Sequence, residues 1–386
     1  MTPQGPSGIT ARMRITRWLP GMWSDLDQTA PFSASTAALK AAGDRIPGTP
    51  LAFLLQESGR PAAGMYGTVI AASQPYEVFN LHHVVSDVAP MLPLCRESRI
   101  RRAELARQTA LADWSPNLIL MYPSYECFAV GPSAGSQPHL EKLVRGIVDW
   151  AADADMRAVA FLYVPSPGGP VSPLARALAT QGFHRIPLSY KCVLHLTGSD
   201  FGDYLRSLPP KRRCEVRREL RVTERRGISF GTHSLHECFD DVVRLRCALV
   251  RKYRGSADGN AERARLARIA ALWSEHEIGV FYGARDDTIL GLGVFYGDRR
   301  LWFPYWTGAD YTDPHHRLIY FRTAYYDPIR LALGSGVMEI DYGQGSWQAK
   351  QARGCELTPM DGWVMPLRDN LRPIVVASAA CTELCR

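Results

Sequence analysis

Hydrophobic residues follow two kinds of period along the first half of the chain. A helical period at 139–154 is followed by a buried-strand pattern at 157–165. Two strand patterns within 51–72 meet at Ser58-Gly59-Arg60, which predicts a β-hairpin. The Arg-rich segment 96–107 is expected to be irregular. The other elements predicted in this half are a helix near 34–44, a strand at 117–130, a helix at 173–181 and a strand at 185–196.

The second half repeats this order of elements. Candidates for antiparallel strands come first. A helix, a strand, a second helix and a further strand follow them, and this order is typical of an α+β fold. The predicted elements are a helix at 210–226, a helical pair at 235–276, strands at 278–285, 288–297 and 300–309, a helix at 317–333, a strand at 337–343 and a short helix at 347–354. Ser199 or Asp200 is suited to cap the first of these helices. We therefore expect domains at 1–200 and 201–366, and a C-terminal tail at 367–386.

Composition excludes a disordered or membrane-spanning chain. With 386 residues and 46% hydrophobic content, the chain is long and apolar enough to form packed cores. No stretch reaches the roughly 18 apolar residues of a membrane span, and the first residues contain no continuous apolar segment typical of a signal peptide. We expect a soluble, cytoplasmic protein.

The chain has nine cysteines, an odd number, and they are scattered along the sequence. They form no CxxC pair and no Cys/His cluster at the spacing of metal ligands. They are typical of reduced thiols in a protein without a bound metal, and no cofactor is expected. Cys381 and Cys385, four residues apart, allow one alternative, a metal or redox pair on one helix face.

Charge is concentrated in one helix candidate. The chain has a net charge of +7, and the stretch 206–226 holds nine basic and three acidic residues, so it contributes +6. Arg213, Arg217, Arg221 and Arg225 recur every four residues and predict a basic stripe along one face. A solvated helix that pairs with its own glutamates is one reading, and contact with phosphates is the other.

Two segments carry a resemblance to a known family. They are "LPPKRRCEVRRELRVTERRGISF" at 208–230 and "HRLIYFRTAYYDPIRLALGSGVMEIDYGQGSWQAKQARGCELTP" at 316–359, the second extending to about Pro366. Both resemble the second domain of Fem-type aminoacyl transferases, in the peptidoglycan biosynthesis/recognition branch of the acyl-CoA N-acyltransferase (GNAT) superfamily. The resemblance implies an α+β fold of two tandem GNAT-like domains, each a mixed, mostly antiparallel sheet flanked by helices.

The same resemblance implies an aminoacyl-tRNA donor rather than acyl-CoA. Enzymes that bind acetyl-CoA carry a glycine pattern after the central strand, where backbone N–H groups hold the pyrophosphate. The corresponding stretch here, "TGADYTDPHHRLIY" at 307–320, lacks that pattern, as Fem-type enzymes do. On this basis the expected tRNA-binding residues are Lys211, Arg212, Arg213, Arg217, Arg218, Arg221 and Arg225.

Candidate catalytic residues lie mainly in the second matched segment. Lys350 is one of only six lysines, and Asp341 ends a strand before the Gly343-Gln344-Gly345 turn. Lys350 is expected to neutralise charge at the ester or terminal phosphate, and Asp341 to accept or orient the amine's proton. His315 and Tyr305 complete the catalytic candidates. The expected substrate-binding residues are Trp306, His316, Arg317, Tyr320, Gln344 and Arg353.

Each of these residues also has a structural interpretation. The aromatic residues suit a core, "DPHHR" at 313–317 suits a polar cap at a helix start, and Lys350 suits a surface. The favoured function is an enzyme that transfers an aminoacyl group from tRNA to the amine of a small molecule or precursor, in specialised-metabolite (for example antibiotic) or cell-wall biosynthesis. The alternatives are an N-acyltransferase that uses a CoA or carrier-protein thioester, and a non-catalytic module that binds precursors. No GxSxG or P-loop motif supports a serine hydrolase or a P-loop ligase.

Overall fold

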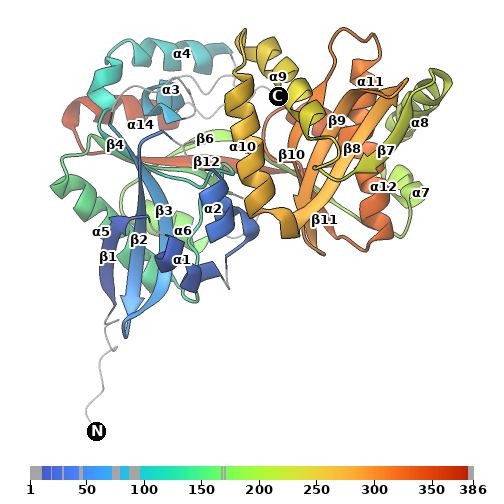
Figure 1. Cartoon of the computed structure of the whole chain (residues 1–386). Helices are drawn as coiled ribbons and strands as arrows, with labels where there is room; N and C mark the ends of the chain where they lie inside the picture. The colour runs from blue at the N-terminus through green and yellow to red at the C-terminus, as the bar shows by residue number, and fades with distance from the viewer. Residues whose placement is uncertain are drawn as a thin grey trace. The chain divides into compact units, whose positions relative to one another are not determined.

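The computed structural model describes residues 11–18, 20–27, 30–42, 47–71, 79–86, 96–166, 168 and 171–380. The chain divides into two compact units, drawn in Figure 1. Unit 1 comprises Met1–Tyr190 and Thr358–Arg386, and unit 2 comprises Lys191–Leu357. This division differs from the expected boundaries near residues 200 and 366, because the C-terminal segment returns to unit 1.

Unit 1 contains a sheet with the strand order β1-β2-β3-β4-β5-β12-β6. The pairs β1–β2, β2–β3, β3–β4 and β5–β12 are antiparallel, and β4–β5 is parallel. Its strands are β1 (Arg12–Arg17), β2 (Thr49–Glu57), β3 (Arg60–Ile70), β4 (Asn117–Leu120), β5 (Ala158–Pro165), β6 (His184–His195) and β12 (Glu356–Pro366). Its helices are α1 (Pro20–Asp27), α2 (Thr36–Ala42), α3 (Leu81–Ser86), α4 (Arg96–Ala106), α5 (Gln137–Asp153), α6 (Pro173–Thr180) and α14 (Arg372–Ala380).

Strand β2 separates two cores in unit 1. Its side chains alternate, so that Ala52 and Leu54 join one hydrophobic cluster while Leu51 and Phe53 join the other. The apolar stripe of α5, predicted from its helical period, lies in the second cluster. The predicted hairpin of β2 and β3 is confirmed, with Glu57 opposite Arg60.

Two predictions in unit 1 are wrong. The segment 96–107 forms helix α4 instead of an irregular stretch, and its buried Arg102 donates from Nη2 to the Ser378 carbonyl at 3.1 Å. The expected tail contains α14, whose Ile374 and Val375 are buried. Burial of these side chains in the first core explains why this segment folds. The Cys381 and Cys385 pair lies outside the described residues.

Unit 2 contains a sheet with the strand order β6-β11-β10-β9-β8-β7. Its own strands are β7 (Ser229–His233), β8 (Glu277–Arg285), β9 (Thr288–Gly297), β10 (Leu301–Ala309) and β11 (Glu339–Asp341). The pairs β6–β11, β7–β8, β8–β9 and β9–β10 are antiparallel, and β10–β11 is parallel. The helices are α7 (Phe201–Ser207), α8 (Pro210–Arg225), α9 (Phe239–Arg254), α10 (Gly259–Leu272), α11 (His316–Phe321), α12 (Asp327–Gly334) and α13 (Trp347–Gln351). The predicted helix at 317–333 is divided, since the π-helical segment η6 (Arg322–Tyr326) separates α11 from α12.

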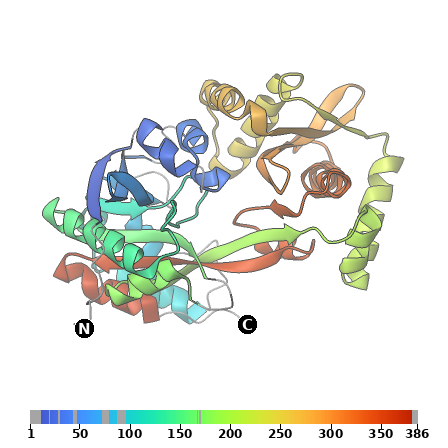
Figure 2. The same ribbon diagram turned by 90° about the horizontal axis from the view of Figure 1, so that it is seen from below.

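Glycines allow helices to pack closely on both faces of the unit 2 sheet. A Cβ atom at Gly308 would lie 2.7 Å from the backbone of Leu245 in α9, and one at Gly291 would lie 2.7 Å from the Ile319 side chain in α11. Gly291 is opposite Ala309, the neighbour of Gly308, so the two glycines face opposite sides. Figure 2 shows the strands of this sheet between α9 and α10 on one side and α12 on the other.

Among the described residues, no helix is long and apolar enough to span a membrane.

Candidate functional site

Strands β10 and β11 separate at the point where the candidate residues begin. Their parallel pairing covers two residue pairs, ending at Trp302 opposite Ile340. In β10 the register with β9 shifts at Tyr305, which is a β-bulge. Tyr305 is half-buried and packs edge-on against Trp273, with ring centroids 4.9 Å apart. Trp306 is buried, and the Arg246 guanidinium lies 5.4 Å from its ring centroid.

Asp341, at the end of β11, is held by two groups. Its Oδ2 pairs with the Lys191 ammonium at 2.9 Å, and its Oδ1 accepts a hydrogen bond from the Gly343 N–H at 2.8 Å. Both side chains of the ion pair are partly exposed, 17% for Asp341 and 20% for Lys191. The structure thus presents a fixed carboxylate that is accessible to solvent, as a proton acceptor requires.

Lys350 lies on α13 and holds the turn that follows β11. Its ammonium donates to the carbonyls of Tyr342 and Gln344 at 2.7 Å each and of Gly343 at 3.4 Å. The side chain is buried, and burial lowers the pKa of Lys350. The surface position, which was the structural alternative for Lys350, is therefore wrong. All three N–H groups are used within the chain, so the immediate task of this lysine is to fix the turn.

Arg353, one turn further on, is enclosed by aromatic rings. Its guanidinium lies 3.5 Å from the centroid of Phe321 and 5.2 Å from that of Tyr325. Nη1 donates to the Ala349 carbonyl at 2.8 Å, and Nη2 lies 3.7 Å from the Glu219 carboxylate of α8. The side chain is 3% exposed. It therefore links α13 to α8 and is covered by protein.

The DPHHR segment forms a cap at the start of α11. The Asp313 carboxylate accepts from the His315 N–H and from Arg285, both at 2.7 Å. Nδ1 of His316 lies 2.8 Å from the Asp313 carbonyl. Both histidines are half-buried, and Arg317 is exposed. The capping interpretation of this segment accounts for these contacts.

Tyr320 completes the cluster. It shares a hydrogen bond with Tyr325, and burial raises its pKa. Tyr325 in turn stacks on Tyr342, with ring centroids 4.5 Å apart, beside the turn that Lys350 holds. The structure thus brings Tyr320, Asp341, Gln344 and Lys350 to one region of unit 2.

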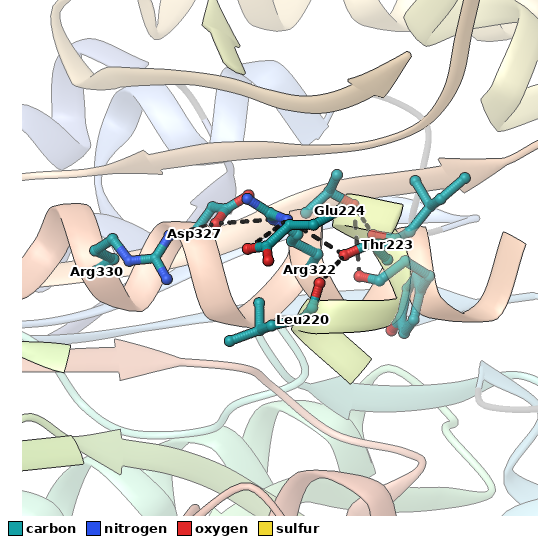
Figure 3. Close-up of polar contacts among 9 residues, drawn as sticks. Leu220, Thr223, Glu224, Arg322, Asp327 and Arg330 are labelled. Atoms are coloured by element: carbon teal, nitrogen blue, oxygen red, sulfur yellow. Dashed lines mark hydrogen bonds and ion pairs between the residues drawn. The ribbon is translucent and has the colours of Figure 1, made fainter. Parts of the chain in front are cut away.

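Helix α8 is docked through one face. Val216 and Thr223 are buried, and Arg322 of the π-helical segment donates to Thr223 Oγ1 at 3.2 Å. Figure 3 shows Arg322 between Thr223 and Glu224 on α8 and Asp327 on α12. The Glu219 carboxylate accepts a hydrogen bond from the Tyr326 hydroxyl.

These contacts occupy the acidic residues of α8. Glu219 interacts with Tyr326 and Arg353, Glu224 with Arg322, and Glu215 with Arg212. Glu219 and Glu224 thus contact groups outside α8, so the reading in which the helix pairs with its own glutamates holds for Glu215 and Arg212.

The opposite face of α8 remains basic. Arg213 does not belong to it, because it is half-buried and donates to the carbonyls of Arg206 and Leu208, at 3.2 and 3.1 Å, at the end of α7. Arg212 is half-buried and pairs with Glu215. Among the described residues, no ion pair or hydrogen bond engages the side chains of the remaining five expected residues, all exposed: Lys211, Arg217, Arg218, Arg221 and Arg225. We call these five residues the basic face. They fall within about a third of the helix circumference, opposite Val216 and Thr223.

The sequence analysis missed Lys191, Glu219, Arg322 and Tyr326. Lysine is scarce in the chain, and the scarcity that pointed to Lys350 also applies to Lys191. No comparable signal marked the other three, whose importance depends on contacts between α8 and the segment after α11. In the described part of the chain, no group of three His, Cys, Asp or Glu side chains is placed to hold a metal ion.

Two cysteines beside Lys350 are expected to be unreactive. Burial raises the pKa of Cys192 to about 11 and that of Cys355 to about 12, so both remain thiols at neutral pH. Cys214 on α8 is exposed. Brief alkylation of the native protein at pH 7, followed by peptide mapping, should label Cys214 well before Cys192 or Cys355. Rapid labelling of Cys192 or Cys355 would show that the thiols are accessible and that a thiolate nucleophile is available.

Comparison with known proteins bears on the family and the fold. The sequence model of the FemAB-like family, described as peptidoglycan biosynthesis/recognition, matches residues 104–377. The structure of FemX is similar at 10% identity, with a TM-score of 0.58, covering 94% of this chain and 99% of that one. A tandem GNAT protein from the clavulanic acid biosynthesis pathway is similar at 14% identity, with a TM-score of 0.50, covering 92% and 98%.

A comparison with curated proteins finds no match. The structural similarities establish the fold, which confirms the expected α+β arrangement of GNAT-like domains. The family match covers well over half of the chain, and family and fold together indicate a transferase of acyl or aminoacyl groups. The chain belongs to the FemAB-like family of peptidoglycan biosynthesis/recognition proteins.

Proposed function

We propose that the protein transfers an aminoacyl group from aminoacyl-tRNA to an amine and forms an amide bond. The observation that carries the proposal is the basic face of α8, where five exposed cations have no acidic partner among the described residues. Cations arranged in this way suit a chain of phosphates, and arginine binds phosphate in a bidentate manner. The family description supports an amine on a cell-wall precursor as the acceptor.

Asp341 is the proposed proton acceptor. The acceptor ammonium loses a proton to the Asp341 carboxylate, and its nitrogen attacks the ester carbonyl carbon. The C–N bond forms, and the C–O bond to the ribose breaks. The second proton of the attacking nitrogen passes to the ribose oxygen, and Asp341 releases the first proton to solvent. Lys191 orients the carboxylate through their 2.9 Å ion pair and leaves it partly exposed to the incoming amine. No covalent enzyme intermediate is required, because the ester is already activated.

The turn after β11 positions this carboxylate. The Gly343 N–H that binds Asp341 belongs to the segment whose carbonyls surround the Lys350 ammonium. Lys350 therefore acts on Asp341 through the turn, in addition to the role at the ester suggested by the family resemblance. His315 and Tyr305 remain the alternative proton-transfer groups, and His316, Arg317, Tyr320 and Gln344 the residues proposed to line the substrate.

Asp341→Asn should slow transfer most at low pH. The asparagine keeps the shape of the side chain but accepts no proton, so the reaction depends on amine that is already neutral. The deficit relative to wild type should therefore shrink as pH rises from about 6 to 9. Steady-state rates across this range test the prediction, with circular dichroism to establish folding. A deficit that is independent of pH would remove Asp341 as proton acceptor and direct attention to His315.

Purification of the intact protein from cells tests the donor class directly. Bound tRNA should raise the ratio of absorbance at 260 nm to that at 280 nm, and ribonuclease should abolish the increase. Protein that carries no RNA and binds none when purified tRNA is added would contradict the proposal. Acyl transfer from acetyl-CoA under the same conditions would instead support the thioester alternative.

A further inference from the structure

The end of helix α9 presents an aromatic ring to solvent among cations. Tyr253 is 74% exposed. Arg251 and Lys252, both exposed, precede it in the last turn of α9, which Gly255 terminates. Cations at a helix C-terminus are common because the helix dipole favours them. A largely exposed tyrosine ring beside these cations is not explained by the dipole.

Two further tyrosines lie beside this ring. The Lys252 ammonium lies 3.9 Å from the ring centroid of Tyr311 and 5.6 Å from that of Tyr253. The pKa of Tyr311 is raised to about 12, first by burial and then by the neighbouring phenols of Tyr253 and Tyr320. The end of α9 is therefore adjacent to the start of α11, where His316 packs against Tyr311 with ring centroids 5.4 Å apart.

Helix α11 connects this surface to the basic face of α8. Helix α8 packs against α11, and Figure 1 shows α11 between α9 and α8. Cations thus occur on both sides of α11, on α8 and at the end of α9. A ligand that contacts both needs several negative charges along its length, as a chain of phosphates provides.

We infer that Tyr253, with Arg251 and Lys252, forms a subsite for the unpaired 3′ end of an RNA, in which a base stacks on the Tyr253 ring and the cations contact adjacent phosphates. The inference rests on the proposed function, since it assigns a place to the donor's terminal nucleotides. Exposed aromatic rings beside cations are the recurrent means by which proteins hold single-stranded nucleic acid. The stretch 307–320 lacks the glycine pattern that holds the pyrophosphate of CoA, which favours RNA as the occupant.

A double-mutant cycle with RNA tests the inference without catalysis. The probes are a fluorescent single-stranded RNA ending in CCA and the same RNA without its terminal base. For the wild-type protein, loss of the base should weaken binding about fivefold to a hundredfold. Tyr253→Ala should weaken binding of the intact RNA by a similar factor and should no longer distinguish the two probes. Tyr253→Phe keeps the ring and should behave as wild type.

Two results would overturn the subsite. The first is Tyr253→Ala protein that still distinguishes the two probes. The second is CoA that displaces the RNA from wild type but not from Tyr253→Ala, which would assign the surface to the nucleotide of CoA. If RNA binding depends on Arg217 and Arg221 but not on Tyr253, only the subsite is wrong. If the wild-type protein binds no RNA, the proposed function fails with it.

Discussion

Charge reversal on the basic face of α8 is expected to weaken tRNA binding about a hundredfold at physiological salt. The variant replaces Arg217, Arg218 and Arg221 with glutamate. Each lost phosphate contact removes a charge-assisted hydrogen bond, and each new carboxylate repels the backbone, so roughly 1 kcal/mol per site is a moderate expectation. Stability should change little, because the three side chains are exposed and the docked face of α8 is untouched.

Salt dependence separates phosphate contact from an unspecific loss of affinity. The logarithm of the wild-type affinity should fall linearly with the logarithm of salt concentration, and the triple variant should lose about two to three units of that slope. A matched control reverses Arg268, Arg299 and Arg300, which are exposed elsewhere in unit 2 and change the net charge equally. Equal weakening in both variants, or binding that is insensitive to salt, would show that the basic face is only solvated.

Replacement of Lys350 by methionine is expected to reduce transfer about a hundredfold and to destabilise the protein. Removal of the ammonium takes the Lys350 donor from the buried Tyr342 carbonyl and from the half-buried Gln344 carbonyl. Loss of the donor to a buried group typically costs about 1–3 kcal/mol. The turn also carries the Gly343 N–H that fixes Asp341, and a shift of about 1 Å at a reacting group is able to reduce the rate about a hundredfold. Steady-state kinetics and thermal unfolding measure the two effects.

The pattern of these effects identifies what Lys350 does. If it fixes the turn, Lys350→Met should lower kcat and Tm and leave the salt dependence of RNA binding unchanged. Lys191→Met is a matched control, because it removes the ion pair to Asp341 while the carbonyls keep their donor. Unchanged Tm together with a reduced salt slope would contradict the positioning role and indicate direct contact with the donor's phosphate.

Periodicity predicted the parts of the site that depend on local pattern. The four-residue recurrence along α8 placed Arg217, Arg221 and Arg225 on one exposed face, because a helix of that length has a fixed geometry. Arg213 has the same spacing, yet it turns to the free carbonyls at the end of α7. The four-residue period predicts the helix face on which a residue lies. It does not predict the groups that a neighbouring helix presents to that residue.

For a related reason, the sequence did not predict which groups contact one another within unit 2. The structural alternative for Lys350 was a surface position, whereas three carbonyls of a turn several residues earlier surround its ammonium. Glu219 appeared to be a partner for the arginines of its own helix, whereas Tyr326 and Arg353 lie more than a hundred residues away in sequence. Helix α14 was missed, and residues 356–366 were assigned to the second domain, because the packing of β12 and α14 depends on strands from the first half of the chain.

Transfer from charged tRNA tests the central claim most directly. The protein is incubated with tRNA pools that each carry one labelled amino acid, together with amine acceptors that include cell-wall precursors, and the products are analysed by mass spectrometry. The account predicts that label from at least one pool appears in an amide, that ribonuclease treatment beforehand abolishes the product, and that Asp341→Asn forms less of it at neutral pH. Label that stays on tRNA with every acceptor, while acyl-CoA yields amide under the same conditions, would contradict it.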